Sequence, residues 1–238
     1  MDYRESHLAK GGTYDTTIAT QPFDAYMASV EARCLREIVP PLMHGRGRYL
    51  DFACGTGRIT ATVAPLVAES VGVDISESML AAAREKCSST RFVCADLARE
   101  SPDLGTFDLV TSFRFFGNAQ HELRVAALGA IAPLVRPGGL LIVNSHRNPN
   151  SIGARLQSWR GHAQGMDLTY GRMKRLLREH GFQIVAVRTI GFWVIRARMR
   201  TGEVLNGRAA EIAERVFRHR FWAPLAPDCI IVARKSER

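Results

Sequence analysis

The sequence predicts a doubly wound α/β domain, in which a mainly parallel sheet is covered by helices on both faces. From about residue 48 onward, short apolar segments alternate with amphipathic ones. The apolar segments lack the polar alternation of a strand with one wet face. The 238 residues, 46% hydrophobic and 23% charged, suffice for one sizeable core. We expect a ligand of this sheet to lie beyond the carboxyl ends of its strands.

The individual elements follow from the periodicity of the apolar residues. In the leader, 1–46, helical spacing predicts a helix from about 24 to 38 that stops at two prolines. The core, 47–146, alternates strands and helices, and the remainder, 147–238, adds two strands with an insertion at 191–227. Without internal repeats or low-complexity linkers, the whole chain is expected to form a single domain. Expected strands are 48–53, 70–74, 90–94, 107–112, 139–144, 182–190 and 228–234, and expected helices are 57–67, 76–87, 120–134, 170–180 and 207–219.

Composition argues against several classes of protein. No segment reaches the roughly 18 consecutive apolar residues of a membrane-spanning helix. The first residues also lack the apolar core and cleavage site of a secretory signal, so we expect a cytoplasmic protein. The five cysteines form no CxxC pair and no Cys/His cluster with zinc spacing, which favours buried free thiols over disulfides or a metal site. They are Cys34, Cys54, Cys87, Cys94 and Cys229.

Charge is distributed unevenly along the chain, whose net charge is +9. Residues 1–146 contain 14 basic and 16 acidic residues, whereas residues 147–238 contain 18 basic and 7 acidic ones, and 16 of those 18 are arginines. A solvated basic face explains such an excess. An anionic substrate, a nucleic acid or an anionic membrane surface explains it equally well.

The segment Leu50 to Arg58, with the sequence LDFACGTGR, is the strongest local signal. Gly55 and Gly57 permit a sharp turn between the first strand and the next helix, and that helix offers free N–H groups to an anionic ligand. A plain strand-to-helix connection is the alternative interpretation. A nicotinamide cofactor is disfavoured, because Thr60 occupies the position of the third glycine in that fingerprint.

Acidic residues end the next two expected strands. Asp74 lies 17 positions after Gly57, where a carboxylate can accept both ribose hydroxyls of an adenosine ligand. It is also placed to cap the helix that starts at Ser76. Asp96 can accept from an adenine amine while Ile75 and Leu97 enclose the ring. By itself, Asp96 is equally typical of a loop or a helix cap.

These motifs resemble those of the class I S-adenosylmethionine-dependent methyltransferases over roughly residues 45–146. The matching segments occur in the family's order: LDFACGTGR, VGVDISESML, FVCADLA, FDLVTSFRFF and LVRPGGLLIVNSH. The resemblance implies a Rossmann-like sheet of seven strands in the order 3-2-1-4-5-7-6, with the last strand antiparallel. Outside this region the resemblance weakens; there we expect residues 1–46 to form a helical lid and residues 147–238 to form the acceptor-side cover and the last two strands.

The resemblance also implies positions for the cofactor, S-adenosylmethionine. The turn from Asp51 to Gly57 would hold its methionine part, and Ala53 stands where a glycine is common. We expect this alanine to have a negative φ and to be a mild change. The implied cofactor residues are Asp51, Ala53, Gly55, Thr56, Gly57, Asp74, Ile75, Asp96, Leu97, Ser112, Phe113 and, from the leader, Tyr14.

Methyl transfer from a sulfonium needs alignment of the acceptor and, for some acceptors, removal of a proton. This logic requires no metal. His146, beyond the fifth strand, is the candidate base, because histidine titrates in the useful range; the alternative is an ordinary polar loop residue. Candidates for holding the acceptor are Arg114, Asn144, Arg147 and Trp193.

The first functional hypothesis is methylation of O or N in a small molecule such as a metabolite, sugar or natural-product intermediate. Arginines in the cover, such as Arg147 and Arg155, favour an acceptor with phosphate or carboxylate. RNA or DNA methylation is the second hypothesis, although the fourth strand is not followed by an Asn/Asp-Pro-Pro-Tyr-like motif. The third is a membrane-associated enzyme acting on a lipid-linked or quinone-like acceptor. In that hypothesis the helix at 207–219 contacts the membrane; alternatively, its apolar stripe packs on the domain.

Overall fold

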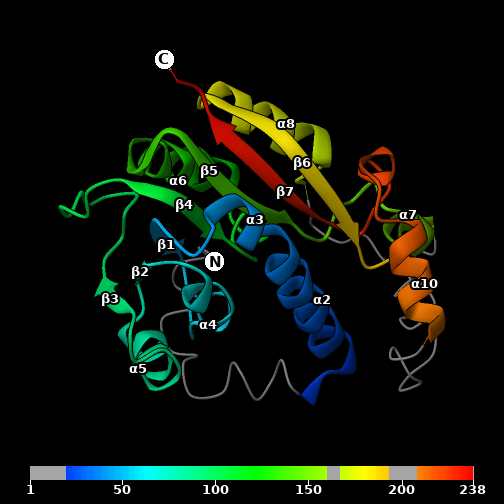
Figure 1. The fold of residues 1–238 in the computed structure, drawn as a ribbon. Coiled ribbons are helices and arrows are strands. Elements are labelled where there is room, and N and C mark those ends of the chain that lie inside the picture. The colour runs from blue at the N-terminus through cyan, green and yellow to red at the C-terminus, as the bar shows by residue number, and fades with distance from the viewer. Residues whose placement is uncertain (1–19, 160–166, 193–207, 238) are drawn as a thin grey trace.

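A computed structural model describes residues 20–159, 167–192 and 208–237 of the chain, so Tyr14 and Trp193 lie outside the described residues. Its centre is a seven-stranded sheet in the order β3-β2-β1-β4-β5-β7-β6 (Figure 1). Strands β1 to β5 are parallel, whereas β7 runs antiparallel to both β5 and β6. The strands are β1 (Arg48–Phe52), β2 (Glu69–Asp74), β3 (Arg91–Cys94), β4 (Phe107–Ser112), β5 (Val135–Ser145), β6 (Phe182–Ile190) and β7 (Asp228–Lys235).

Helices cover both faces of this sheet. Neighbouring residues of each central strand enter opposite cores: Tyr49 and Leu109 pack with α2, whereas Leu50 and Val110 belong to the core that includes α6 and α8. Neither face of these strands meets water, which explains why their sequences lack polar alternation. The helices are α2 (Pro22–Ile38), α3 (Pro40–Met43), α4 (Arg58–Val63), η1 (Ala64–Leu66), α5 (Glu77–Lys86), α6 (His121–Leu134), α7 (Ile152–Trp159), α8 (Tyr170–Glu179), α10 (Arg208–Val216) and η2 (Arg220–Trp222).

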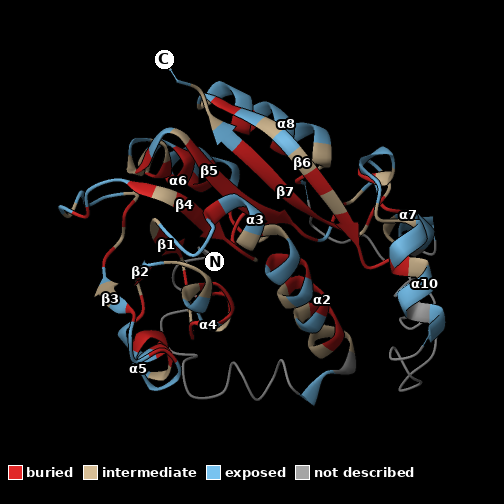
Figure 2. Ribbon diagram, viewed as in Figure 1, coloured by how far each residue is buried: buried red, intermediate tan, exposed pale blue. Residues whose placement is uncertain are grey.

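The expected fold class and strand order are confirmed, and each expected strand is present. Strand β5 is longer than expected, beginning at Val135 instead of residue 139, because Val135 pairs with Phe107 ahead of a register shift. We expected both faces of the whole sheet to be covered, and this expectation is wrong for the two edge strands. In β6, Gln183 and Val185 are exposed, and β3 has exposed residues at both ends (Figure 2).

The cysteines are free, as expected, but one of them is not buried. Cys94 is exposed because it ends the edge strand β3, whereas Cys34, Cys54, Cys87 and Cys229 are buried. Over the residues that the structure describes, no helix combines the length and apolar character needed to cross a membrane.

Candidate functional site

The turn after β1 is built from residues with positive φ. Ala53, Gly55 and Gly57 have φ values of 55°, 55° and 75°. A Cβ atom at Gly57 would lie 3.0 Å from the Cβ of Ala83, so glycine lets the turn approach α5 closely. The expectation of a negative φ at Ala53 is wrong. Alanine occupies the left-handed region there, which is unfavourable for a residue with a Cβ.

Asp74, at the end of β2, holds this turn in place. Its Oδ2 accepts a hydrogen bond from the backbone N–H of Gly55 at 2.8 Å, and its Oδ1 accepts from the N–H of Ser76 at 3.0 Å. Ser76 is itself the N-cap of α5, since its Oγ accepts from the N–H of Met79. Asp74 therefore links the glycine turn to the start of the next helix.

Asp51 is a buried carboxylate beneath the turn. Its two oxygens accept hydrogen bonds from the hydroxyls of Thr60 at 2.6 Å and Thr111 at 2.7 Å. Burial raises the pKa of Asp51 to about 6, and the two hydroxyls, together with Arg58, only partly oppose that shift. The site thus contains a carboxylate whose charge is not fully compensated by the protein.

A second buried carboxylate, Glu31, lies on α2. It has no exposed surface. Its Oε2 lies 2.7 Å from Arg58 Nη1, and its Oε1 accepts a hydrogen bond from Asn144 Nδ2 at 3.0 Å and lies 3.7 Å from Arg114 Nε. Arg114 also pairs with Asp24 at 3.1 Å. Helix α2 is thereby joined to the segments that follow β1 and β4 and to the end of β5.

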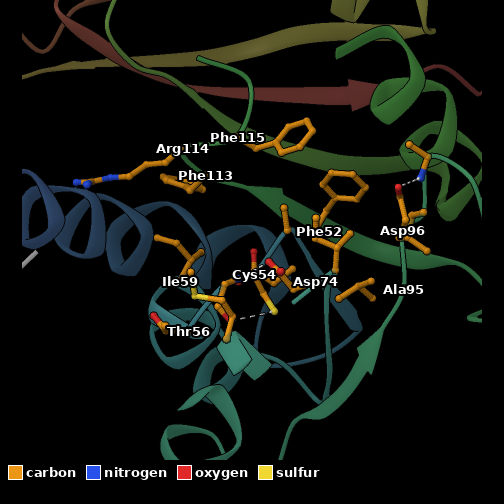
Figure 3. A pocket seen from close by; sticks show the side chains of 18 of the residues that line it. Phe52, Cys54, Thr56, Ile59, Asp74, Ala95, Asp96, Phe113, Arg114 and Phe115 are labelled. Carbon is orange, nitrogen blue, oxygen red and sulfur yellow. Dashed lines mark hydrogen bonds between the residues drawn. The ribbon is translucent and has the colours of Figure 1, made fainter. Parts of the chain in front are cut away.

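These groups surround one cleft at the carboxyl edge of the sheet, with a volume of about 990 Å³ including its open mouth. The rings of Phe113 and Phe115 lie across the cavity from Cys54 and Asp74 (Figure 3). Ten of the predicted site residues line this cleft: Asp51, Ala53, Gly55, Thr56, Asp74, Ile75, Asp96, Leu97, Phe113 and Arg114.

Other predicted residues of the described part do not line the cleft. Ser112, Asn144 and His146 are buried beside it, whereas Arg147 is exposed and its N–H donates to Asp228. Gly57 does not line the cleft either; its lack of a side chain lets the turn lie close to α5. The side-chain atoms Ser112 Oγ, Ser145 Oγ and His146 Nδ1 are buried without a hydrogen-bond partner among the described residues.

His146 is poorly suited to accept a proton in this structure. Burial and the nearby guanidinium groups of Arg114, Arg147 and Arg58 lower its pKa to about 3. The imidazole is therefore neutral near pH 7 and has little affinity for a proton. Its role as a catalytic base stays a prediction.

The sequence analysis missed Arg58 as a cleft residue and Glu31 as its partner. A signal for Glu31 was present, because it shares the core-facing side of α2 with Met27, Cys34 and Leu35. An acid at such a position must find partners. Asp96 lines the cleft as expected, and its Oδ1 also accepts from the N–H of Ala98 at 3.1 Å. Over the described ranges there is no cluster of three or more His, Cys, Asp or Glu arranged to hold a metal ion.

The sequence of the site region matches a family model described as "Methyltransferase domain" over residues 50–139. Residues 50–139 therefore form a methyltransferase domain, and the motifs in them resemble those of the class I S-adenosylmethionine-dependent methyltransferases. This region contains both the glycine turn and the acidic residues that end β2 and follow β3. The matched region therefore coincides with the cleft.

Curated relatives of this methyltransferase match only its core. "Putative methyltransferase YqeM" of Bacillus subtilis is 28% identical over 140 residues, covering 56% of this chain and 52% of the relative. "Demethylmenaquinone methyltransferase" of Beutenbergia cavernae is 34% identical, covering 43% and 42%. "Trans-aconitate 2-methyltransferase" of an Acidovorax species is 33% identical, covering 47% and 43%. The chain spans about half the length of the curated relatives it matches.

Solved structures match this methyltransferase over nearly its whole length. Magnesium protoporphyrin IX methyltransferase from Synechocystis, with bound SAH, has a TM-score of 0.65 and 18% identity, covering 98% of this chain and 97% of that chain. The N-methyltransferase NodS from Bradyrhizobium japonicum has a TM-score of 0.63 and 16% identity, covering 98% and 96%. At these identities the likeness shows the fold alone.

The strain at Ala53 predicts a stabilising substitution. Ala53→Gly relieves the left-handed backbone strain, whereas Ala61→Gly in the exposed part of α4 only adds backbone freedom. We expect the free energy of unfolding of the Ala53→Gly variant to be higher than that of the Ala61→Gly variant by about 1 kcal/mol or more. Urea denaturation measures both values. Equal effects of the two substitutions would contradict the strain at Ala53.

The buried charges around Glu31 predict a large loss of stability when this carboxylate is neutralised. Glu31→Gln leaves Arg58 and Arg114 without their shared partner, and we expect a loss of about 3 kcal/mol in free energy of unfolding. Glu37→Gln is the matched control, since Glu37 lies on the same helix and forms an exposed pair with Arg218. Its expected loss is under about 1 kcal/mol. Similar losses in the two variants would show that Glu31 is not the structural centre of this network.

Proposed function

We propose that this protein transfers a methyl group from S-adenosylmethionine to an oxygen or nitrogen atom of a small-molecule acceptor. The observation that carries the proposal is the single cleft at the carboxyl edge of β1, β2 and β3. It brings together Asp51, Asp74 and Asp96 beside a glycine turn. This combination suits a ligand with a cationic end, a ribose and an amine-bearing base.

The chemistry of the lining supports an orientation for this cofactor. The partly uncompensated carboxylate of Asp51 favours the cationic methionine end. Asp74, held between two backbone N–H groups, is placed for the ribose hydroxyls. Ile75 and Leu97 offer apolar surface to the adenine, with Asp96 at its edge. Magnesium protoporphyrin IX methyltransferase was crystallised with SAH and with SAM, and NodS with SAH, which agrees with this assignment.

The remaining lining supports an acceptor site at the opposite end of the cleft. Phe113 and Phe115 supply apolar walls, and Arg114 is bound by Asp24 and Glu31. A sulfonium donor is already activated, so the main task of these residues is to align the acceptor and exclude water. No transfer of a proton to His146 is needed for an acceptor that reacts through a lone pair.

The lining of the cleft best supports a small-molecule acceptor that has an apolar or aromatic part. A relative named for demethylmenaquinone and a structural neighbour named for magnesium protoporphyrin IX agree with this class, whereas a relative named for trans-aconitate, a carboxylate, agrees with an anionic acceptor. The lining of the cleft gives the anionic alternative less support. Arg147 and Arg155 are exposed and do not line the cleft, while Arg58 and Arg114 are paired with acids.

Nucleic-acid methylation remains an alternative with weaker support. Arginines of the last third that the structure describes include Arg172, Arg175 and Arg178, which lie on the exposed side of α8. That helix packs its buried side on the core through Met173 and Leu177. None of these three arginines lines the cleft.

Calorimetric titration with S-adenosylmethionine and S-adenosylhomocysteine tests the cofactor assignment. We expect micromolar binding by the wild type and at least a tenfold loss in Asp74→Ala, because a charge-assisted pair of hydrogen bonds is removed. Asp103→Ala, on the exposed surface, is the control and should bind normally. Binding of NAD in place of the sulfonium compounds by the folded wild type would overturn the assignment.

The raised pKa of Asp51 predicts that cofactor affinity depends on pH. Below about pH 6 this carboxyl is protonated in the free protein and offers no charge to the methionine ammonium. Affinity should therefore fall as pH drops through 6, by up to about tenfold per unit. Asp51→Asn should bind more weakly at pH 8 and lose this slope. An unchanged slope in the variant would assign the pH dependence to another group.

A further inference from the structure

Three short elements of the segment 147–238, α7, α10 and η2, expose large apolar side chains. On α7, Trp159 is 86% exposed, and on α10, Ile212 and Val216 are 60% and 62% exposed. We define the α7–α10 face as the six exposed large apolar residues of α7, α10 and η2. They are Ile152, Leu156, Trp159, Ile212, Val216 and Phe221.

The outward direction of the α10 apolar residues is set by a buried acid on the opposite side of the helix. Glu214 is 7% exposed and accepts hydrogen bonds from the N–H of Gly191 at 2.9 Å and the hydroxyl of Tyr26 at 3.3 Å. Residues 212 and 216 lie one turn apart and face away from residue 214. Helix α10 thus packs a carboxylate inward and leaves aliphatic side chains in contact with solvent.

Contacts between the elements join this face into one unit. The rings of Phe217 and Trp222 pack at 5.2 Å, which fixes the end of α10 against η2, and Phe221 packs on Trp222 at 5.3 Å. Asn148 Nδ2 donates to the carbonyls of Pro224 and Ala226, and the N–H of Ile152 donates to the carbonyl of Leu225. The start of α7 is therefore fixed to the segment that follows η2.

Arginines are interleaved with the apolar side chains of this face. Arg155 lies between Ile152 and Trp159 at helical spacing, and Arg215 lies three residues after Ile212 and directly before Val216. Arg208 and Arg220 are also exposed. Within the described parts of these three elements, Glu211 is the one exposed acid. Both helices thus present apolar residues flanked by positive charge.

We propose that the α7–α10 face docks on the surface of an anionic phospholipid bilayer. Aliphatic side chains and an exposed tryptophan suit the boundary between headgroups and acyl chains, and arginines suit anionic headgroups. A nucleic acid would use the arginines but would leave the isoleucine, leucine and valine side chains without an apolar partner. The proposal does not depend on the methyl donor or acceptor.

Vesicle flotation of the purified full chain tests this docking. Vesicles of phosphatidylcholine alone are compared with vesicles that also contain phosphatidylglycerol, each at low and high salt. We expect flotation with the anionic vesicles, weakened by salt, and at least tenfold weaker partitioning of the variant Trp159→Ser/Ile212→Ser. Arg208→Gln/Arg215→Gln should lose the preference for anionic lipid.

The control variant is Val125→Ser/Val185→Ser, which removes apolar side chains that are 38% and 48% exposed on α6 and β6. It should float like the wild type. Melting temperatures and S-adenosylmethionine titrations check that each variant is folded. Absence of flotation by the wild type, or equal flotation of all variants, would overturn the proposal. The proposal would also be overturned if the wild type were a dimer that the Trp159→Ser/Ile212→Ser variant fails to form. Salt-dependent binding of the wild type to RNA without binding to vesicles would overturn it as well.

Discussion

The arrangement of the cleft depends on one buried carboxylate, Glu31. Its partners are Arg58 after β1, Arg114 after β4 and Asn144 in β5, so three carboxyl-edge segments converge on one side chain of α2. A buried charge without partners is costly, and these segments can therefore pack against α2 only when the network is complete. Helix α2 is accordingly part of the core and, through Glu31, part of the site's framework.

The network also divides the charge of the cleft into two regions. Arg58 and Arg114 are paired with Glu31 and Asp24, so their positive charges are largely balanced. Asp51 is instead buried with hydroxyl donors and carries a raised pKa, which Arg58 opposes only in part. A cationic group of a ligand therefore gains most beside Asp51, and an uncharged group is best accommodated beside the paired arginines.

The sequence predicted the sheet well because its signals are local. Apolar runs, the Gly55 and Gly57 turn and the acids after β2 and β3 each sit within a few residues, and ten of the predicted residues line the cleft. What it missed depends on contacts distant in sequence. Glu31 and Asn144 are 113 positions apart, and the turn in which Ala53 has a left-handed φ is hydrogen-bonded through Gly55 to Asp74 on the next strand. Helix α7 was not predicted, although Ile152, Leu156 and Trp159 have helical spacing; in the structure these side chains are exposed and do not form part of the core.

Helix α2 connects the cleft to the exposed α7–α10 face. One side of α2 presents Glu31 to the cleft loops, and another presents Tyr26 and Glu37 to Glu214 and Arg218. The same helix therefore contacts both the loops of the cleft and the residues in and next to α10. If ligand binding in the cleft and contact at the α7–α10 face both depend on the position of α2, each must alter the affinity of the other by the same factor.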